Sequence, residues 1–431
     1  MTVSLDLMRQ AARPLVTGRV RRVVGLNLEV EGLDAAIGDA VHVDVNGTDL
    51  PAEVVALRDG ALVCMPFGIL QGVRAGSPVL ASGGPLGIGL GEELLGRVLN
   101  GLGSPVDGGP PLDHLPQAGV SGTPPHPLRR ARVNQPLTLG VRALDTLVPV
   151  GRGQRLGIFA GSGVGKSTLL SMVARNSEAD VSVIALVGER GREVREFLEN
   201  DLGTAGLARS VVVVTTSDEP ALVRLRAALT ATRIAEWFRD QGRHVVLMMD
   251  SVTRFAMAQR EIGLSAGEVP ATRGYPPSVF ALLPQLLERA GTGEIGSITG
   301  LYTVLVEGDD MNEPIGDAAR SILDGHVVLT RKLATAGHFP SIDVLESVSR
   351  VATAVTMPDQ RAAATELRQL LAAHRDAKDL LEIGAYAHGS SPLVDRAIAI
   401  EQQMTGFLRQ DVHDRAPIDE SWARLFQLVG R

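Results

Sequence analysis

The sequence Ala160-Gly-Ser-Gly-Val-Gly-Lys-Ser167 follows an apolar run over Arg155–Ala160 and leads into a helical pattern over Ser167–Arg175. Glycines let successive backbone N–H groups turn toward phosphate oxygens, and the N-terminus of the following helix adds its positive end. The phosphate-loop pattern requires Gly, four residues and then Gly-Lys-Ser/Thr; Ala160 replaces the first Gly, while Gly165-Lys166-Ser167 is intact. The stretch therefore predicts a phosphate loop, with Lys166 on the outer phosphates of a nucleotide and the Ser167 hydroxyl on Mg²⁺.

Lysine is scarce in this chain, which makes its presence at the loop informative. Of the 42 basic residues only three are lysines, Lys166, Lys332 and Lys378. The alternative, an ordinary glycine-rich turn between a strand and a helix, would place one of these three at the loop by accident. The predicted nucleotide-binding residues are Gly161, Ser162, Gly163, Val164, Gly165, Lys166, Ser167 and Thr168.

Two acidic residues follow apolar strands and complete a nucleotide site. Asp250 ends the run His244–Asp250, and a carboxylate at the end of a strand beside the loop is a partner for Mg²⁺, in part through water. Glu189 follows the strand Val181–Val187, where it could orient and polarise the water that attacks the γ-phosphate. Taken alone, Asp250 could be a helix cap, and the charge-rich turn at Glu189 could be a solvated loop.

The region around the loop alternates strands and helices. Strands that are apolar throughout, separated by helices, predict a mostly parallel sheet covered on both faces. The expected strands and helices are Arg155–Ala160, Val181–Val187, Val211–Val214, Val245–Met249 and Thr303–Val306, with helices over Ser167–Arg175, Arg192–Asn200 and Pro220–Gln241.

The regions on either side of this α/β region have different sequence patterns. Short strands cut by glycines after Thr17 predict a small β-barrel, with strands in Gly18–Val24, Ala40–Val45, Ala52–Ala56 and Ala61–Cys64. After Met357 we expect only helices, over Asp359–Tyr386, Ser391–Gln410 and Asp419–Val429, the second with Ser391 as N-cap and Pro392 in the first turn. The expected division is an N-terminal helical segment (1–16), a β-barrel (17–85), a nucleotide-binding α/β domain (86–356) and an all-α domain (357–431).

Composition excludes several classes of protein. A net charge of −7 argues against a general nucleic-acid coat. A single cysteine, Cys64, excludes an internal disulfide and a Cys-based zinc site, and fits a reducing compartment. The start of the chain lacks the apolar stretch of a secretory signal, and no segment has the 18 or more uncharged apolar residues expected of a membrane span.

Long runs of this sequence resemble the catalytic subunits of rotary ATP synthases and, more closely, type III protein-export ATPases of the flagellum-specific kind. The likeness extends over nearly the whole chain. The runs that carry it are the three motifs above, the segment Leu95–Gly108 and the export-type stretches Pro270–Phe280, Leu286–Gly291, Val306–Ile315 and Arg320–His326.

The resemblance implies further roles. A RecA-like α/β domain would hydrolyse Mg-ATP within a homohexamer, and Arg350 matches the arginine finger that enters a neighbouring subunit's site. Arg190, beside Glu189, would contact the γ-phosphate, and Phe339 matches an aromatic that stacks on adenine. From the residues alone, Arg350 could equally be a surface arginine at a helix end, and Phe339 a core residue.

The resemblance also implies partners and a location. The helix–turn–helix Ile383–Pro392 is similar to the contact with a central coiled-coil stalk, although the family usually has an acid where Ser391 stands. Residues 1–16 resemble the segment that binds a dimeric negative regulator. Export substrates, their chaperones and the membrane export gate would complete the set, and the enzyme would be cytoplasmic and peripherally associated with the export apparatus at the inner membrane.

Four other interpretations compete with flagellar export. A virulence-injectisome ATPase shares the same motifs. A non-catalytic nucleotide-binding ring subunit keeps the phosphate loop but lacks the carboxylate present here as Glu189. A hexameric transcription-termination helicase also has a small barrel, but Thr17–Leu80 contains only one aromatic, Phe67, for stacking on bases, so no nucleic-acid partner is expected. Membership of a rotary synthase itself is disfavoured by the export-type runs.

Overall fold

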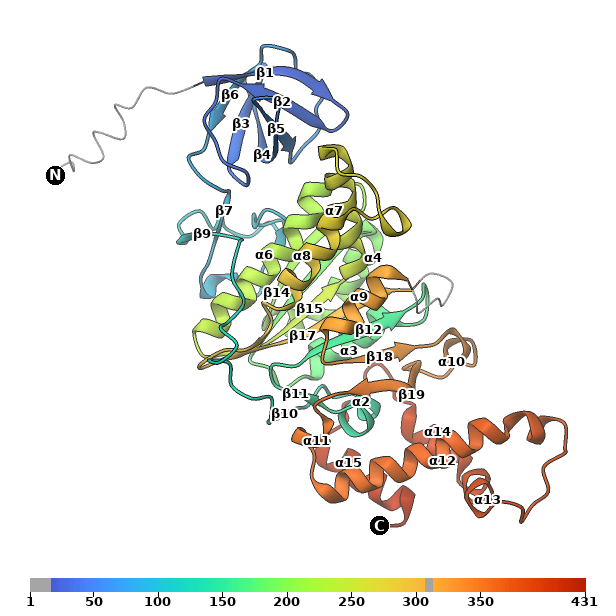
Figure 1. Ribbon diagram of the computed structural model, residues 1–431. Helices are drawn as coiled ribbons and strands as arrows, with labels where there is room; N and C mark the ends of the chain where they lie inside the picture. The colour runs from blue at the N-terminus through green and yellow to red at the C-terminus, as the bar shows by residue number, and fades with distance from the viewer. Residues whose placement is uncertain (1–16, 307–312) are drawn as a thin grey trace.

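The computed structural model describes residues 17–306 and 313–431 and divides them into a barrel, a central sheet with helices on both faces, and a helical C-terminal region (Figure 1). This architecture confirms the predicted fold class. The helical segment predicted over 1–16 lies outside the described residues. In those described, no helix combines the length and apolar character that crossing a membrane requires.

The N-terminal barrel is closed in the strand order β1-β2-β5-β4-β3-β6. Alternating apolar side chains fill it, among them Val20, Leu28, Val41 and Val54, all at most 1% exposed. Strands β2 and β6 were not predicted from the sequence, and β4 is longer than predicted. The strands are β1 (Thr17–Val24), β2 (Asn27–Glu31), β3 (Ala40–Val45), β4 (Thr48–Arg58), β5 (Ala61–Pro66) and β6 (Pro78–Ala81).

A nine-stranded sheet forms the centre of the described chain, in the order β19-β18-β12-β17-β15-β13-β14-β8, with β16 paired to β17. All pairs are parallel except those of β16 and β19. Each of the five predicted strands overlaps an observed strand, but Thr303–Val306 covers only the C-terminal end of β17, and β8, β16, β18 and β19 were not predicted. The strands are β8 (Val98–Asn100), β12 (Arg155–Ala160), β13 (Val181–Glu189), β14 (Ser210–Thr216), β15 (His244–Asp250), β16 (Gly291–Thr292), β17 (Ser297–Leu305), β18 (Gly325–Leu329) and β19 (Ile342–Ser349).

Helices cover both faces of this sheet and create two cores. One core packs α6 (Ala221–Asp240), α7 (Val252–Ala266), α8 (Pro277–Leu287) and α9 (Pro314–Ile322) on one face. The other packs α2 (Arg142–Leu147), α3 (Lys166–Asn176) and the C-terminal helices on the opposite face. Because β13 is buried at all nine positions, its apolar sequence faces a core on each side.

The C-terminal helices are α11 (Ala352–Val355), α12 (Pro358–Glu382), α13 (Pro392–Ala399), α14 (Glu401–Leu408) and α15 (Ile418–Val429). Three helix predictions are wrong in detail. The helix expected over Asp359–Tyr386 is α12, which ends at Glu382. The helix expected over Ser391–Gln410 is interrupted at Ile400, where φ −113° and ψ 16° leave the helical region, although Ser391 and Pro392 begin α13 as predicted. The helix expected over Arg192–Asn200 is α4 (Gly191–Glu196), which continues as a π-helix over Phe197–Leu202.

Several short elements connect these layers. The connector between barrel and sheet contains β7 (Gly87–Gly89) paired with β9 (Gln117–Gly119), and a short helix, η1 (Glu92–Leu94). The other short elements are β10 (Pro136–Leu137), β11 (Val150–Gly151), α5 (Gly203–Leu207), η3 (Thr272–Gly274) and α10 (Arg331–Thr335).

Candidate nucleotide site

The phosphate loop connects β12, in the middle of the sheet, to α3. Gly163 (φ 75°) and Gly165 (φ 91°) adopt left-handed conformations that side-chain-bearing residues rarely adopt, and a Cβ at Gly163 would meet no atom within 4 Å. The loop is anchored from inside by Val164, which is 1% exposed and whose carbonyl accepts a hydrogen bond from Ser341 Oγ at 2.5 Å. The loop therefore has free space beside Gly163 and is held in place through Val164.

The start of α3 lies directly at this loop. Its N-cap residue is Gly165, so no side chain caps the first N–H groups of the helix. These groups and the helix dipole favour an anion at the loop. Ser167 and Thr168 lie in this first turn, and the Ser167 side chain is exposed.

Two carboxylates converge on the loop lysine. Lys166 Nζ lies 2.5 Å from Asp250 Oδ1 and 3.7 Å from Glu189 Oε1. Glu189 ends β13 and Asp250 ends β15, and these two strands are neighbours in the sheet. The carboxyl ends of parallel strands meet at the same side of a sheet. Lys166 and Asp250, which are 84 positions apart in sequence, therefore come into contact there.

Burial strengthens the electrostatic interactions among Lys166, Glu189 and Asp250. The side chains of Glu189 and Asp250 are 8% and 4% exposed. Burial, and next the nearby Asp250 carboxylate, raise the pKa of Glu189, while Lys166 and Arg254 oppose that rise. Glu189 Oε1 is buried and makes no hydrogen bond of good geometry within the described chain. A raised pKa suits a carboxylate that accepts a proton.

Two further side chains belong to this group and were not predicted from the sequence. Thr303, on β17, donates a hydrogen bond from Oγ1 to Asp250 Oδ1 at 2.8 Å, which fixes that carboxylate. Arg254, in the first turn of α7, lies with Nε 3.3 Å from Glu189 Oε1. The available signal for Arg254 was its position, one helical turn after the strand that ends at Asp250.

Ser167, Glu189 and Asp250 also line a small cavity of about 20 Å³. This volume is large enough for a single water molecule. The predicted Mg²⁺ ligands, Ser167 and Asp250, are therefore brought to the same space. Within the described ranges no cluster of three or more His, Cys, Asp or Glu side chains could hold a metal by itself. A hydroxyl and one carboxylate fit Mg²⁺, which commonly takes its remaining ligands from water and substrate phosphates.

A larger cavity of about 550 Å³ adjoins the loop and fits the base and sugar of a nucleotide. Phe339 lies on its wall, 43% exposed, and its ring would be 3.4 Å from a Cβ at Gly165. The C-terminal region also lines this cavity, through Arg409, Gln410, Asp411, Val412 and Asp414. The predicted aromatic thus lies beside the loop, on a cavity shared with the C-terminal region.

Arg190 does not join the Lys166 group. Its side chain is 75% exposed and pairs with Glu193 at 3.4 Å, on the outer side of α4. It is adjacent to Glu189 in sequence, but the strand ends between them and the two side chains have different surroundings.

Arg350 lies at the amino-terminal end of the parallel strands, whereas the phosphate loop follows the carboxyl end of β12. It follows Ser349 at the end of β19, which pairs with Gly325 at the start of β18, while His326 pairs with Gly157. The loop instead follows Ala160, at the other end of β12, about 10 Å further along the strand. The exposed Arg350 side chain contacts the Arg320 carbonyl at 3.4 Å. Arg350 is therefore separated from the Lys166 group of its own chain.

Three family models match this chain. The nucleotide-binding domain of the ATP synthase alpha/beta family matches residues 140–349, and the beta-barrel domain of the same family matches residues 20–83. The T3SS EscN ATPase C-terminal domain matches residues 356–427. Together they extend over the barrel, the sheet and the C-terminal helices described above.

Full-length relatives are similar to the chain throughout. The flagellum-specific ATP synthase of Bacillus subtilis (strain 168) is 51% identical, over 96% of this chain and 95% of that protein. The type 3 secretion system ATPase of Xanthomonas euvesicatoria is 49% identical, over 91% of this chain and 89% of that protein.

Solved structures match as well. The assembled ATPase EscN of the enteropathogenic E. coli type III secretion system superimposes with a TM-score of 0.91 at 46% identity, over 96% of this chain and 100% of that chain. EscN in complex with its central stalk EscO matches with a TM-score of 0.89 at 45% identity, over the same shares of the two chains.

Proposed function

The chain belongs to the ATP synthase alpha/beta family, in the branch of flagellum-specific ATP synthases and type 3 secretion system ATPases, and we propose that it is the ATPase that energises export of flagellar proteins. The observation that carries the proposal is the convergence of Lys166, Glu189 and Asp250 at the carboxyl edge of β12, β13 and β15. The two carboxylates and the ammonium are the charges that ATP hydrolysis needs.

In the proposed mechanism the loop residues Gly161–Thr168 bind the phosphates through backbone N–H groups, and Lys166 places its compact charge on the outer phosphates. The Ser167 hydroxyl and the Asp250 carboxylate would hold Mg²⁺, which neutralises phosphate charge when it is bound with ATP. Phe339 stacks on the adenine ring in the 550 Å³ cavity.

Glu189 is the proposed base. It orients a water molecule toward the γ-phosphorus and accepts its proton as the bond from the γ-phosphorus to the bridging oxygen breaks. Its raised pKa makes it a better proton acceptor than an exposed glutamate. Arg254 and Thr303 hold the two carboxylates in place. Arg190 would have to leave Glu193 to reach the γ-phosphate.

We further propose that Arg350 acts on the nucleotide of a neighbouring subunit in a homohexamer. Its position at the end of the strands opposite to the loop supports action in trans. A cation supplied in this way stabilises the charge of the transferring phosphoryl group.

The proposed partners attach at the two ends of the chain. A dimeric negative regulator would bind residues 1–16. A central coiled-coil stalk would contact Ile383–Pro392, where Asp395 accepts hydrogen bonds from Tyr386 Oη and Gly389 N at 3.0 Å each and so shapes the loop beside Ser391. Export chaperones, substrates and the membrane export gate complete the assembly, which would place the enzyme in the cytoplasm at the inner membrane. The domain limits proposed for these roles are 17–85, 86–356 and 357–431.

Flagellar and injectisome relatives match the chain to nearly the same extent. Deletion of the gene separates the two systems. We expect loss of motility and of hook and filament proteins from the culture medium, restored by the wild-type chain and not by Glu189→Gln. Retained motility with loss of host-directed effectors would assign the chain to an injectisome.

Steady-state phosphate release by the purified full-length chain tests the chemistry. Turnover of Mg-ATP that rises more steeply than the protein concentration is the expected result, because complete sites form only between subunits. A chain that binds ATP but shows no turnover at any concentration would instead be a non-catalytic ring subunit. Stimulation of turnover by RNA would favour a nucleic-acid motor.

A further inference from the structure

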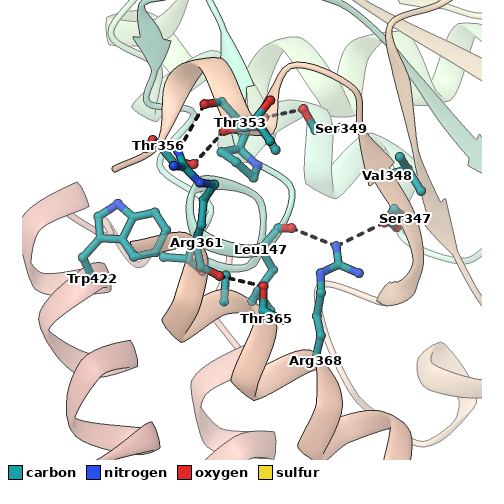
Figure 2. Close-up of a pocket in the computed structure, with 14 residues that line it drawn as sticks. Leu147, Ser347, Val348, Ser349, Thr353, Thr356, Arg361, Thr365, Arg368 and Trp422 are labelled. Atoms are coloured by element: carbon teal, nitrogen blue, oxygen red, sulfur yellow. Dashed lines mark hydrogen bonds between the residues drawn. The ribbon is translucent and has the colours of Figure 1, made fainter. Parts of the chain in front are cut away.

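Two arginines of the C-terminal region hold the segment that carries Arg350. Arg361 and Arg368 are seven residues apart on α12, so they lie on the same face of that helix. Arg361 Nη1 donates hydrogen bonds to the carbonyls of Thr353 (3.1 Å) and Thr356 (2.5 Å), on the C-terminal side of Arg350. Figure 2 shows the Arg361 side chain reaching the turn that contains these residues.

Arg368 holds the N-terminal side of the same segment. Its Nη1 donates to the Val344 carbonyl at 2.5 Å, and its Nη2 donates to the carbonyls of Ser347 (3.1 Å) and Leu147 (2.8 Å). The contacts with Leu147 and Ser347 are drawn in Figure 2. The two guanidinium groups therefore support the backbone on either side of Arg350.

Besides the two arginines, Ser349 ties the segment down on this side, since its Oγ donates a hydrogen bond to the Pro149 carbonyl at 2.7 Å. A cavity of about 310 Å³ lies between the segment and α12, lined by Ser347, Val348, Ser349, Thr353 and Thr356 together with Arg361 and Arg368. Neither arginine forms an ion pair with an acidic side chain in the described ranges. Their donors are directed at backbone carbonyls, so the hydrogen bonds replace the side-chain packing that a filled interface would provide.

On its other side the segment is tied to the strand of the phosphate loop. The Arg350 amide donates to the Asp324 carbonyl at 3.0 Å, and Arg155 at the start of β12 binds the Asp324 carboxylate through Nε and Nη2 at 3.0 Å each. Gln154, fully buried, donates to the same Asp324 carbonyl at 3.1 Å and to Ser349 Oγ at 3.2 Å. The base of Arg350 is thus fixed by β12, and its flanks by α12.

We propose that Arg361 and Arg368 are positioning residues that set the orientation of Arg350 toward the neighbouring subunit's nucleotide. This inference rests on the proposed function, in which Arg350 acts in trans. The helix that carries both arginines, α12, begins at Pro358 and is continuous over 25 residues to Glu382, directly before the proposed stalk contact at Ile383. The two arginines and the residue before the proposed stalk contact therefore belong to one unbroken helix.

The test replaces both arginines by methionine, which retains a long side chain without the guanidinium donors. For Arg361→Met/Arg368→Met we expect kcat to fall about tenfold or more with KM for ATP unchanged, since the variant's own phosphate loop is intact. Arg375→Met is the matched control, because Arg375 is on the same helix but pairs with the exposed Glu346 side chain at 2.8 Å. The control should stay within about twofold of the wild type.

Mixed assemblies separate positioning from damage to the fold. Lys166→Ala subunits have an inactive loop but an intact Arg350, so mixing them with Arg361→Met/Arg368→Met subunits should give more turnover than the two preparations summed. No gain on mixing, or full turnover by the double variant alone, would overturn the inference. The same mixture made with Arg350→Ala subunits tests the proposed function itself, because a failure to gain there means that Arg350 does not act in trans.

Discussion

Lys166 Nζ lies 2.5 Å from Asp250 Oδ1, and the same ammonium lies 3.7 Å from Glu189 Oε1. One lysine is thus shared by two buried carboxylates that would otherwise repel each other. Because each of the three groups comes from a different segment of the chain, the site depends on the register of β13 against β15. Five predictions follow from these contacts and from two others.

Replacing Lys166 by alanine should lower kcat about 10²-fold or more, since the charge that stabilises the outer phosphates is lost. Lys166→Arg should not restore turnover, because a planar guanidinium does not reproduce a compact ammonium. Lys378→Ala, at an exposed lysine paired with Glu382, is the control. Phosphate release measures all three, and normal turnover by Lys166→Arg would contradict this account of the site.

Glu189→Gln should lower kcat about 10²- to 10⁴-fold, since the amide cannot accept the proton of the attacking water. ATP binding should persist, because Lys166 and Asp250 remain. Equilibrium binding of a fluorescent ATP analogue, measured beside phosphate release, distinguishes the two effects. Glu196→Gln, at an exposed position on α4, should behave as the wild type. Full turnover by Glu189→Gln would exclude it as the base.

In a plot of kcat/KM against pH, the midpoint of the acidic limb should lie above pH 4.5, the ordinary pKa of a glutamate. The reason is that burial and Asp250 raise the pKa of Glu189. Turnover falls as the pH drops through this pKa, since only the deprotonated carboxylate is a base. Arg254 lowers the pKa, so Arg254→Met should move the limb to higher pH. A limb unmoved in Arg254→Met would show that another group controls it.

Phe339→Ala should raise KM for ATP about tenfold, as expected for the loss of one stacked base, with kcat nearly unchanged. The side chain is 43% exposed, so its removal leaves the fold intact. Phe339→Tyr keeps the aromatic face and should restore the wild-type KM. An unchanged KM in Phe339→Ala would place the adenine ring elsewhere.

Arg289→Met should destabilise the chain by about 3–5 kcal/mol, because it leaves Glu236 buried without its main cation. Arg289 Nε and Nη2 bind the two Glu236 oxygens at 2.7 and 2.8 Å, and both side chains are 3% exposed. Urea unfolding measures the loss. The control is Arg129→Met, at an exposed pair with Glu294, which should change stability by less than about 1 kcal/mol.

The sequence was sufficient for the parts of the fold that depend on local pattern. Glycine spacing and continuous apolar runs are local properties of the sequence. They therefore predict the loop Gly161–Ser167 and the buried strands β12, β13 and β15. The break at Ile400 was missed because the apolar periodicity continues across it. Thr303 and Arg254 could not be found from local pattern, since only the alignment of β17 and α7 with β15 brings them to the carboxylates.

The separation of Arg350 from its own phosphate loop has an arithmetical consequence. If each chain supplies a loop at one surface and a finger at another, a lone copy contains no complete site, and an open row of n copies contains n − 1. Closing the row adds a site without adding a subunit, so the last contact to form raises the activity of the whole assembly. The specific ATPase activity would then measure how many rings are closed. Breaking one contact between subunits would inactivate one site.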